Sequence, residues 1–124
     1  MRTNISSNSP YEPVLGFSRA VRKGNQVFVS GTVGRLADST MADGAYEQAR
    51  QAIANIEVAL IQAGSSLNDI VRTRIYVADM AHLDDIARAH REALGNIRPA
   101  STLVEVRMAA PEMLVEIEAD AVIE

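Results

Sequence analysis

The chain contains no cysteine among its 124 residues. This absence excludes disulfide bonds, thiolate nucleophiles and metal sites with cysteine ligands. A reducing compartment is the simplest environment for a chain without disulfides. We therefore expect a cytoplasmic protein.

Aromatic residues and clustered positive charge are also scarce. Aromatics make up 4% of the chain, there is no tryptophan, and the net charge is −4. Phosphate contacts dominate nucleic-acid affinity, and stacking on aromatic side chains supports single-strand binding. An acidic chain without a basic cluster provides neither, so no nucleic-acid partner is expected.

No apolar run approaches the roughly 20 residues that cross a bilayer, so we expect no membrane partner. Residues 1–13 are polar and rich in serine, asparagine and proline, without the apolar segment of a signal peptide. They are predicted to form a loosely held lead-in. Apolar residues make up 48% and charged residues 23% of the chain, which is typical of a globular protein. The length suits one domain spanning residues 1–124.

Strand-like alternation and helix-like spacing follow each other along the chain. Gly24-Asn25 favours a hairpin turn between two alternating segments. Asp43 and Asp79 are candidate helix N-caps, and Gly64 is a candidate helix stop. The predicted order is strands at 17–23 and 26–30, a helix at 45–63, a strand at 69–77, a helix at 80–94, and strands at 101–108 and 113–123.

This β-β-α-β-α-β-β order predicts a two-layer α+β domain, with a mixed sheet and two helices on one face. The other face is predicted to be partly charged. It is either exposed to water or buried against further copies of the chain, and we favour the oligomer. The residues assigned to this face are Arg72, Arg74, Tyr76, Leu103, Glu105, Arg107, Glu116 and Glu118.

Five segments in order resemble the RidA/YjgF family: GFSRAV at 16–21, VFVSG at 27–31, DIVRTRIYVAD at 69–79, RPASTLVEV at 98–106 and VEIEA at 115–119. The resemblance covers nearly the whole chain. It implies a chorismate-mutase-like fold and a homotrimer that binds small molecules in clefts between subunits. It also implies hydrolysis of reactive enamines or imines, such as 2-aminoacrylate, to a keto acid and ammonia. No metal or organic cofactor is implied.

The chain departs from the family pattern at two positions. Family deaminases read P-A-R-S where this chain has Pro99-Ala100-Ser101-Thr102, and their arginine holds the substrate carboxylate. Serine carries no charge, and a buried carboxylate without a counter-charge is costly. Phe17 also replaces a tyrosine that is frequent in the family. The resemblance therefore implies a subfamily outside the archetypal 2-aminoacrylate deaminases. Arg74, Arg19 or Arg107 could supply the missing cation.

Several family roles carry over to this chain. Glu116 matches the acidic residue that positions the attacking water, and Ser30 and Gly31 match the backbone edge of the pocket. Each has a plainer interpretation: Glu116 could belong to a charged strand face, and Arg74 to an interface ion pair. Two functions therefore remain open, a cofactor-independent imine or enamine hydrolase and a non-catalytic small-molecule-binding trimer acting as a sensor or regulator.

Histidine offers no metal site by sequence. His82 and His90 lie eight residues apart on one predicted helix, without a matching ligand cluster. We expect His82 to face solvent and His90 to be a packing residue.

Overall fold

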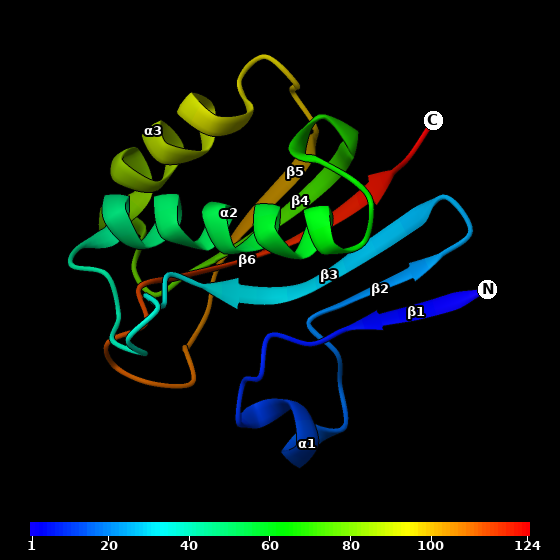
Figure 1. The fold of residues 1–124 in the computed structure, drawn as a ribbon. Helices are drawn as coiled ribbons and strands as arrows, with labels where there is room; N and C mark the ends of the chain where they lie inside the picture. The colour runs from blue at the N-terminus through cyan, green and yellow to red at the C-terminus, as the bar shows by residue number, and fades with distance from the viewer.

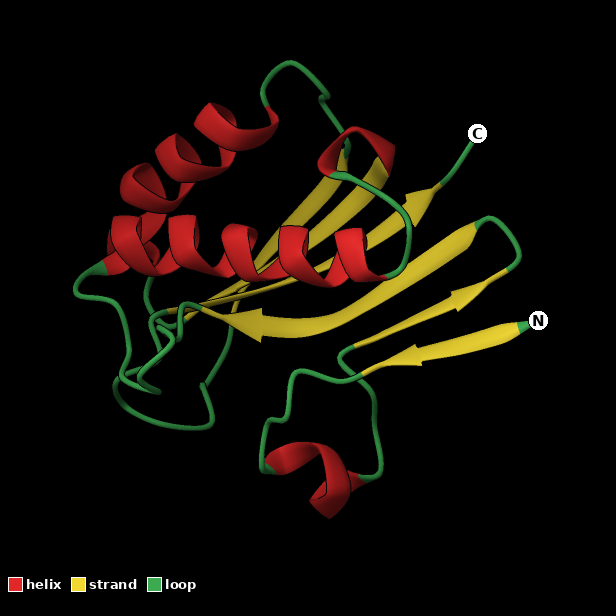
Figure 2. Cartoon of the chain, viewed as in Figure 1, coloured by secondary structure: helices red, strands yellow, loops and turns green.

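One six-stranded mixed sheet, in the order β1-β2-β3-β6-β4-β5, is covered on one face by α2 and α3 (Figures 1 and 2). The computed structural model describes residues 1–124. All neighbouring strands are antiparallel except β4 and β5, which are parallel. The predicted α+β class with a mixed sheet is confirmed. The elements are β1 (Arg2–Ile5), α1 (Tyr11–Leu15), β2 (Ala20–Lys23), β3 (Gln26–Val33), α2 (Ala45–Gln62), η1 (Leu67–Asp69), β4 (Ile70–Val77), η2 (Met80–His82), α3 (Leu83–Leu94), β5 (Ala100–Glu105) and β6 (Val115–Val122).

The N-terminal segment differs from the expected loose lead-in. β1 pairs antiparallel with β2, and α1 lies on the side of the sheet opposite α2 and α3 (Figure 1). The element order therefore gains a strand and a helix. This segment buries little apolar surface, and Ile5 is its one hydrophobic residue packed against the core. Hydrogen bonds rather than apolar packing hold this segment in place. Such bonds produce no hydrophobic periodicity that could be recognised in the sequence.

The hairpin of β2 and β3 forms at the predicted turn, where Gly24 has φ +62°. Its strands have different limits from those expected. β2 begins at Ala20 rather than Phe17, and β3 continues through Gly31 to Val33. The pairing of β3 with β6 shifts between Val29 and Thr32. This β-bulge, which adds a residue to one strand, lets β3 pass Gly31 without ending there.

The long helix α2 is close to its predicted range and contributes much of the core. Its apolar stripe packs with α3 and the sheet in a cluster of 21 buried residues. Gly64 follows the helix with φ +84°, as its predicted role as a stop requires. The predicted Asp43 cap was wrong, because Gly44 occupies the N-cap and no side chain caps the helix. No helix in the structure has the length and apolar character of a membrane span.

Asp79 caps the next helical segment as expected, accepting the backbone N–H of Ala81 at 2.8 Å. That segment begins with the 3₁₀ turn η2, so α3 itself starts at Leu83.

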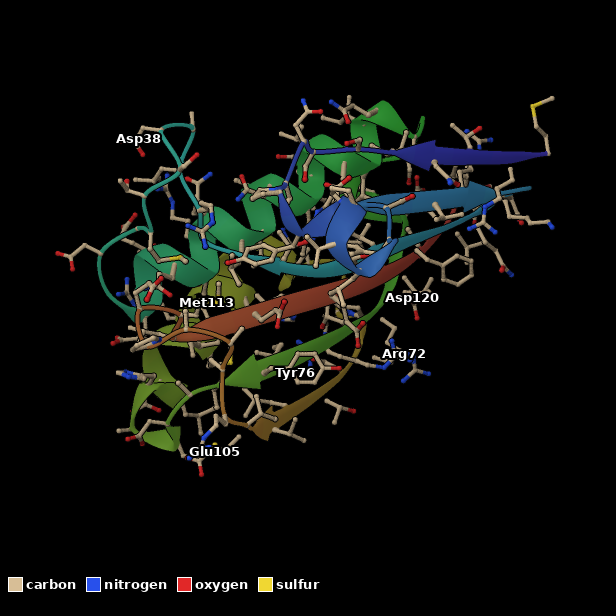
Figure 3. The ribbon with its side chains drawn as sticks, turned by 90° about the horizontal axis from the view of Figure 1, so that it is seen from below. Asp38, Arg72, Tyr76, Glu105, Met113 and Asp120 are labelled. Atoms are coloured by element: carbon tan, nitrogen blue, oxygen red, sulfur yellow. The ribbon has the colours of Figure 1, made fainter.

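Strands β4 and β5 differ from the predictions in three respects. Strict alternation from Arg72, which was predicted on the open face, would place Ile70 there and Val71 toward the helices. A bulge between Ile70 and Arg72 breaks this alternation, so Ile70 is buried and Val71 is 49% exposed. Leu103 lies beside Ile75 and packs against the core, which leaves Val104 on the open face. β5 ends at Glu105, before the predicted limit of residue 108. The face without α2 and α3 carries Tyr76 and Asp120 (Figure 3).

Candidate functional site

Glu116 projects from β6 on the face opposite α2 and α3. Its neighbours Val115 and Ile117 are buried in the core, so the two-residue period of the strand places Glu116 on the other face. The half-buried carboxyl lies against Gly31. A Cβ atom at position 31 would be 2.6 Å from Glu116 Oε2, so only glycine leaves room for the carboxyl in this position.

Arg19, just before β2, contacts the same Gly31 peptide as Glu116, and its charge acts on the Glu116 carboxyl. Its Nη1 donates to the carbonyl of Gly31 at 2.5 Å and to Thr32 Oγ1 at 3.2 Å, and its Nε donates to Ser7 Oγ at 3.3 Å. The guanidinium carbon is 5.5 Å from the centre of the Phe17 ring, within cation–π range. These contacts hold a half-buried positive charge next to the Glu116 carboxyl.

The surroundings of Glu116 change its acidity. Burial raises the pKa of its carboxyl, the positive charge of Arg19 lowers it, and the negative charge of Glu118 raises it, with a net upward shift. Glu116 therefore gains and loses its proton at higher pH than an exposed glutamate. Such a group can orient water and exchange a proton with a reacting molecule.

Ser30 makes two hydrogen bonds to backbone carbonyls beside the site. Its Oγ donates to the carbonyl of Ser18 at 2.7 Å, and its backbone N–H donates to the carbonyl of Arg19 at 2.9 Å. Both bonds tie β3 to the segment that carries Phe17 and Arg19. Ser30 thus fixes the position of Arg19, and its hydroxyl proton is already engaged.

Ser101 lies apart from this cluster. It pairs with Thr73, whose buried hydroxyl donates to Ser101 Oγ at 2.8 Å and lies 2.9 Å from His90 Nε2. Thr73 shares the helix-covered side of the sheet, whereas Glu116 lies on the open side. One chain therefore does not bring Ser101 and Glu116 together.

His90 is half-buried and in contact with Thr73, and burial lowers the pKa of its imidazole. The neutral form is therefore favoured. His82 is also half-buried rather than fully exposed. No group of three or more histidine, aspartate or glutamate side chains is arranged to hold a metal ion.

The other two candidate cations are placed elsewhere. Arg74 Nη1 lies 3.3 Å from Asp120 Oδ2 and 3.8 Å from Glu118 Oε1, so it forms ion pairs on the open face. Arg107 lines a hollow of about 630 Å³ with Met108 and Met113, and Glu116 is not among the residues of that hollow. Of the three arginines, only Arg19 lies beside Glu116 and Gly31.

Two contributors to the site were absent from the sequence predictions. Ser7 contacts Arg19, and Glu12 in turn holds Ser7 through its carboxylate. The serine-rich stretch at 6–9 was the one available signal, since serine side chains cap and bridge charged groups. Tyr76, whose hydroxyl donates to Glu118 at 2.6 Å, completes the polar network of the open face.

The family model described as Endoribonuclease L-PSP matches residues 7–123. The chain belongs to the YjgF/RutC/RidA family. A RutC family protein of Pyrococcus horikoshii is 32% identical over 123 residues, with 94% of each chain covered.

The structural relatives of this YjgF/RutC/RidA chain agree with its fold. A member of the YjgF/YER057c/UK114 family from Mycobacterium tuberculosis superposes with a TM-score of 0.92 at 47% identity, covering 99% of this chain and all of the other.

A Dermatophagoides farinae protein named 2-iminobutanoate/2-iminopropanoate deaminase is similar in sequence. It is 29% identical over 122 residues, covering 97% of this chain and 95% of that protein.

Proposed function

We propose that this family member hydrolyses a small imine or enamine to a carbonyl compound and ammonia, with Glu116 as the catalytic residue. The observation that carries the proposal is the half-buried Glu116 carboxyl, held against Gly31 beside Arg19, with a raised pKa. The deaminase name of the Dermatophagoides farinae relative supports the same reaction class.

Glu116 can supply the proton transfers that this hydrolysis needs. Its carboxylate orients a water molecule and accepts a proton as the water oxygen bonds to the C=N carbon. Glu116 then gives this proton to the nitrogen, which produces a carbinolamine. Glu116 next takes the hydroxyl proton and delivers it to the amine nitrogen, so the C–N bond breaks, ammonia leaves and the carbonyl forms. An enamine first gains a proton at carbon and becomes the imine. The sum is imine plus water to carbonyl plus ammonia.

The proposed site is completed between subunits of a homotrimer. Ser101 and Glu116 lie on opposite faces of one sheet, so a cleft that includes both requires a second chain. In this arrangement Phe17 forms an apolar wall and the Gly31 backbone forms the floor. Ser101 contributes an uncharged contact. We place the reaction in the cytoplasm, in line with the absence of cysteine, and assign no cofactor to it.

Binding without turnover is the alternative function. It is favoured by Ser101, which carries no charge and is exposed at the position where family deaminases have arginine. A sensor or regulator of this kind would bind a keto or imino acid saturably and leave imines unchanged. Direct binding and keto-acid release measured on the same preparation separate the two functions.

Ribonuclease activity, which the description of the family model names, is less well supported by this chain. The net charge is −4, and Glu116 shares its sheet face with Glu118 and Asp120. These carboxylates would repel phosphates, whose contacts dominate nucleic-acid affinity. Cleavage of RNA that falls steeply with added salt would contradict this argument.

A pair of isosteric variants tests the role of Glu116. Glu116→Gln removes the ionisable group, so keto-acid release from 2-iminopropanoate should fall about a hundredfold or more. Asp120→Asn is the control, because Asp120 lies on the same strand and face but pairs with Arg74. Its rate should stay close to that of the unmodified protein. Equal losses in both variants would argue against a specific role for Glu116.

A further inference from the structure

The Arg19 guanidinium has unused hydrogen-bond donors. Arginine presents five N–H groups. Nε donates to Ser7, and the two N–H groups of Nη1 are used by the Gly31 carbonyl and Thr32 Oγ1. The two N–H groups of Nη2 make no hydrogen bond within the chain. They belong to a half-buried cation that is fixed on its other side.

The N-terminal loop holds this cation in its orientation. The carboxylate of Glu12 accepts hydrogen bonds from Ser6 Oγ at 2.9 Å, from Ser7 N and Oγ at 3.0 and 2.6 Å, and from Ser9 N at 3.3 Å. These bonds lower the pKa of Glu12 although its burial acts in the opposite direction. Glu12 thus stays ionised and its oxygens are occupied by the loop. Ser7 Oγ also accepts a hydrogen bond from Arg19 Nε, so Ser7 connects the Glu12 loop to Arg19.

Arg19 and Glu116 meet at one peptide unit. Arg19 Nη1 donates to the Gly31 carbonyl, and Glu116 Oε2 lies 2.6 Å from where a Cβ atom of residue 31 would be. The two groups thus offer a fixed cation and a proton-exchanging carboxyl on either side of the Gly31 peptide. A partly desolvated guanidinium binds carboxylates strongly, because each hydrogen bond is assisted by charge.

We propose that Arg19 binds the carboxylate of a small 2-imino or 2-oxo acid and supplies the positive charge that Ser101 lacks. The proposal rests on the function proposed above, because it places the ligand at Glu116. It makes Arg19 the residue that selects carboxylates over neutral analogues. The N-terminal segment, through Ser7 and Glu12, becomes part of the binding machinery.

Pyruvate and pyruvamide distinguish this role from a structural one. They have nearly the same shape, but pyruvamide carries a neutral carboxamide in place of the carboxylate. Titration calorimetry of the full chain should show that pyruvate binds more tightly. In Arg19→Gln the pyruvate affinity should fall about tenfold or more, as expected for loss of a hydrogen bond to a charged group. The pyruvamide affinity should hardly change.

Two further variants make the test decisive. Arg22→Gln is the matched control, since half-buried Arg22 donates to the carbonyls of Ala63 at 2.8 Å and Gly24 at 2.9 Å, away from Glu116. It should leave both affinities unchanged. Arg19→Lys keeps the charge without the planar fork and should retain part of the preference for pyruvate. It also serves as the test variant if thermal unfolding shows that Arg19→Gln is not folded.

The outcomes separate this inference from the proposed hydrolysis. No preference for pyruvate in the unmodified protein, or equal losses of both ligands in Arg19→Gln or Arg19→Lys, would overturn the role of Arg19. Arginine-dependent pyruvate binding without keto-acid release from imines would instead refute the hydrolase and leave this inference standing. Imine turnover with an unchanged KM in Arg19→Gln would instead refute the role of Arg19 and leave the proposed hydrolysis standing.

Discussion

At the scale of single residues, Glu116 depends on its neighbours for its chemistry. Burial raises the pKa of its carboxyl and Arg19 opposes the rise. The two groups share Gly31, so the charge on one acts directly on the protonation of the other. An exposed glutamate on the same strand would have neither the shifted acidity nor the fixed cation beside it.

This coupling predicts the direction of a pH effect. Water attack needs the ionised form of Glu116, so kcat/KM should rise with pH through the pKa of this carboxyl. Arg19→Gln removes the charge that lowers the pKa of Glu116. The midpoint of the pH–rate profile should therefore move to higher pH. A midpoint that stays in place would show that the carboxyl responsible for the profile is not beside Arg19.

The sequence was only partly sufficient to predict which residues lie together at the candidate site. Glu116 and Gly31 were expected from the family resemblance, and Arg19 was one of three possible cations. The choice among the three needed coordinates, because Arg74 is paired with Glu118 and Asp120 across strands. The contact of Thr73 with Ser101 and His90 joins residues from three elements, and no local spacing in the sequence indicates it.

At the level of elements, Gly31 within β3 and Gly34 just after it have different functions. Gly31 makes room for the mobile end of the Glu116 side chain. Gly34 lies against the backbone of α2, where an added Cβ would be 2.5 Å from Gln48 Cα. A Cβ at position 31 can be accommodated by rotation of the Glu116 side chain. A Cβ at position 34 can be accommodated only if this segment and α2 move apart.

Alanine substitutions should separate these effects. Gly31→Ala should displace the carboxyl and lower kcat/KM about tenfold or more, because small misplacements of catalytic groups are costly, with little change in stability. Gly34→Ala should destabilise the fold by about 1–3 kcal/mol, as overpacking typically does. Urea unfolding and keto-acid release provide the two readouts. Full activity in Gly31→Ala would contradict the placement of the Glu116 carboxyl.

The elements that the sequence predicted are those with a hydrophobic period. The α2 stripe and the β2–β3 hairpin match expectation because burial and turn chemistry leave local signals. β1 and α1 lack such a signal, since the loop around Glu12 is held by polar contacts. The bulge at Ile70–Arg72 reverses the exposure of Val71, and strict alternation cannot indicate where a strand gains an unpaired residue.

At the scale of the whole molecule, the sheet separates two groups of candidate residues. Glu116, Arg19 and Gly31 gather at the open face, and Ser101 lies with Thr73 and His90 toward the helices. The proposed trimer joins the two groups across subunit boundaries. In this proposal the small-molecule site forms between chains rather than within a single chain.

The proposed hydrolysis is tested by keto-acid release from freshly generated 2-iminopropanoate, measured with the unmodified protein and with Ser101→Arg. We expect the unmodified protein to release keto acid faster than the uncatalysed rate, because Glu116 and Arg19 are both present. Ser101→Arg should stay active, with its second cation changing KM more than kcat. Release no faster than the uncatalysed rate in both proteins, with pyruvate still bound, would contradict the hydrolase and favour a binding protein.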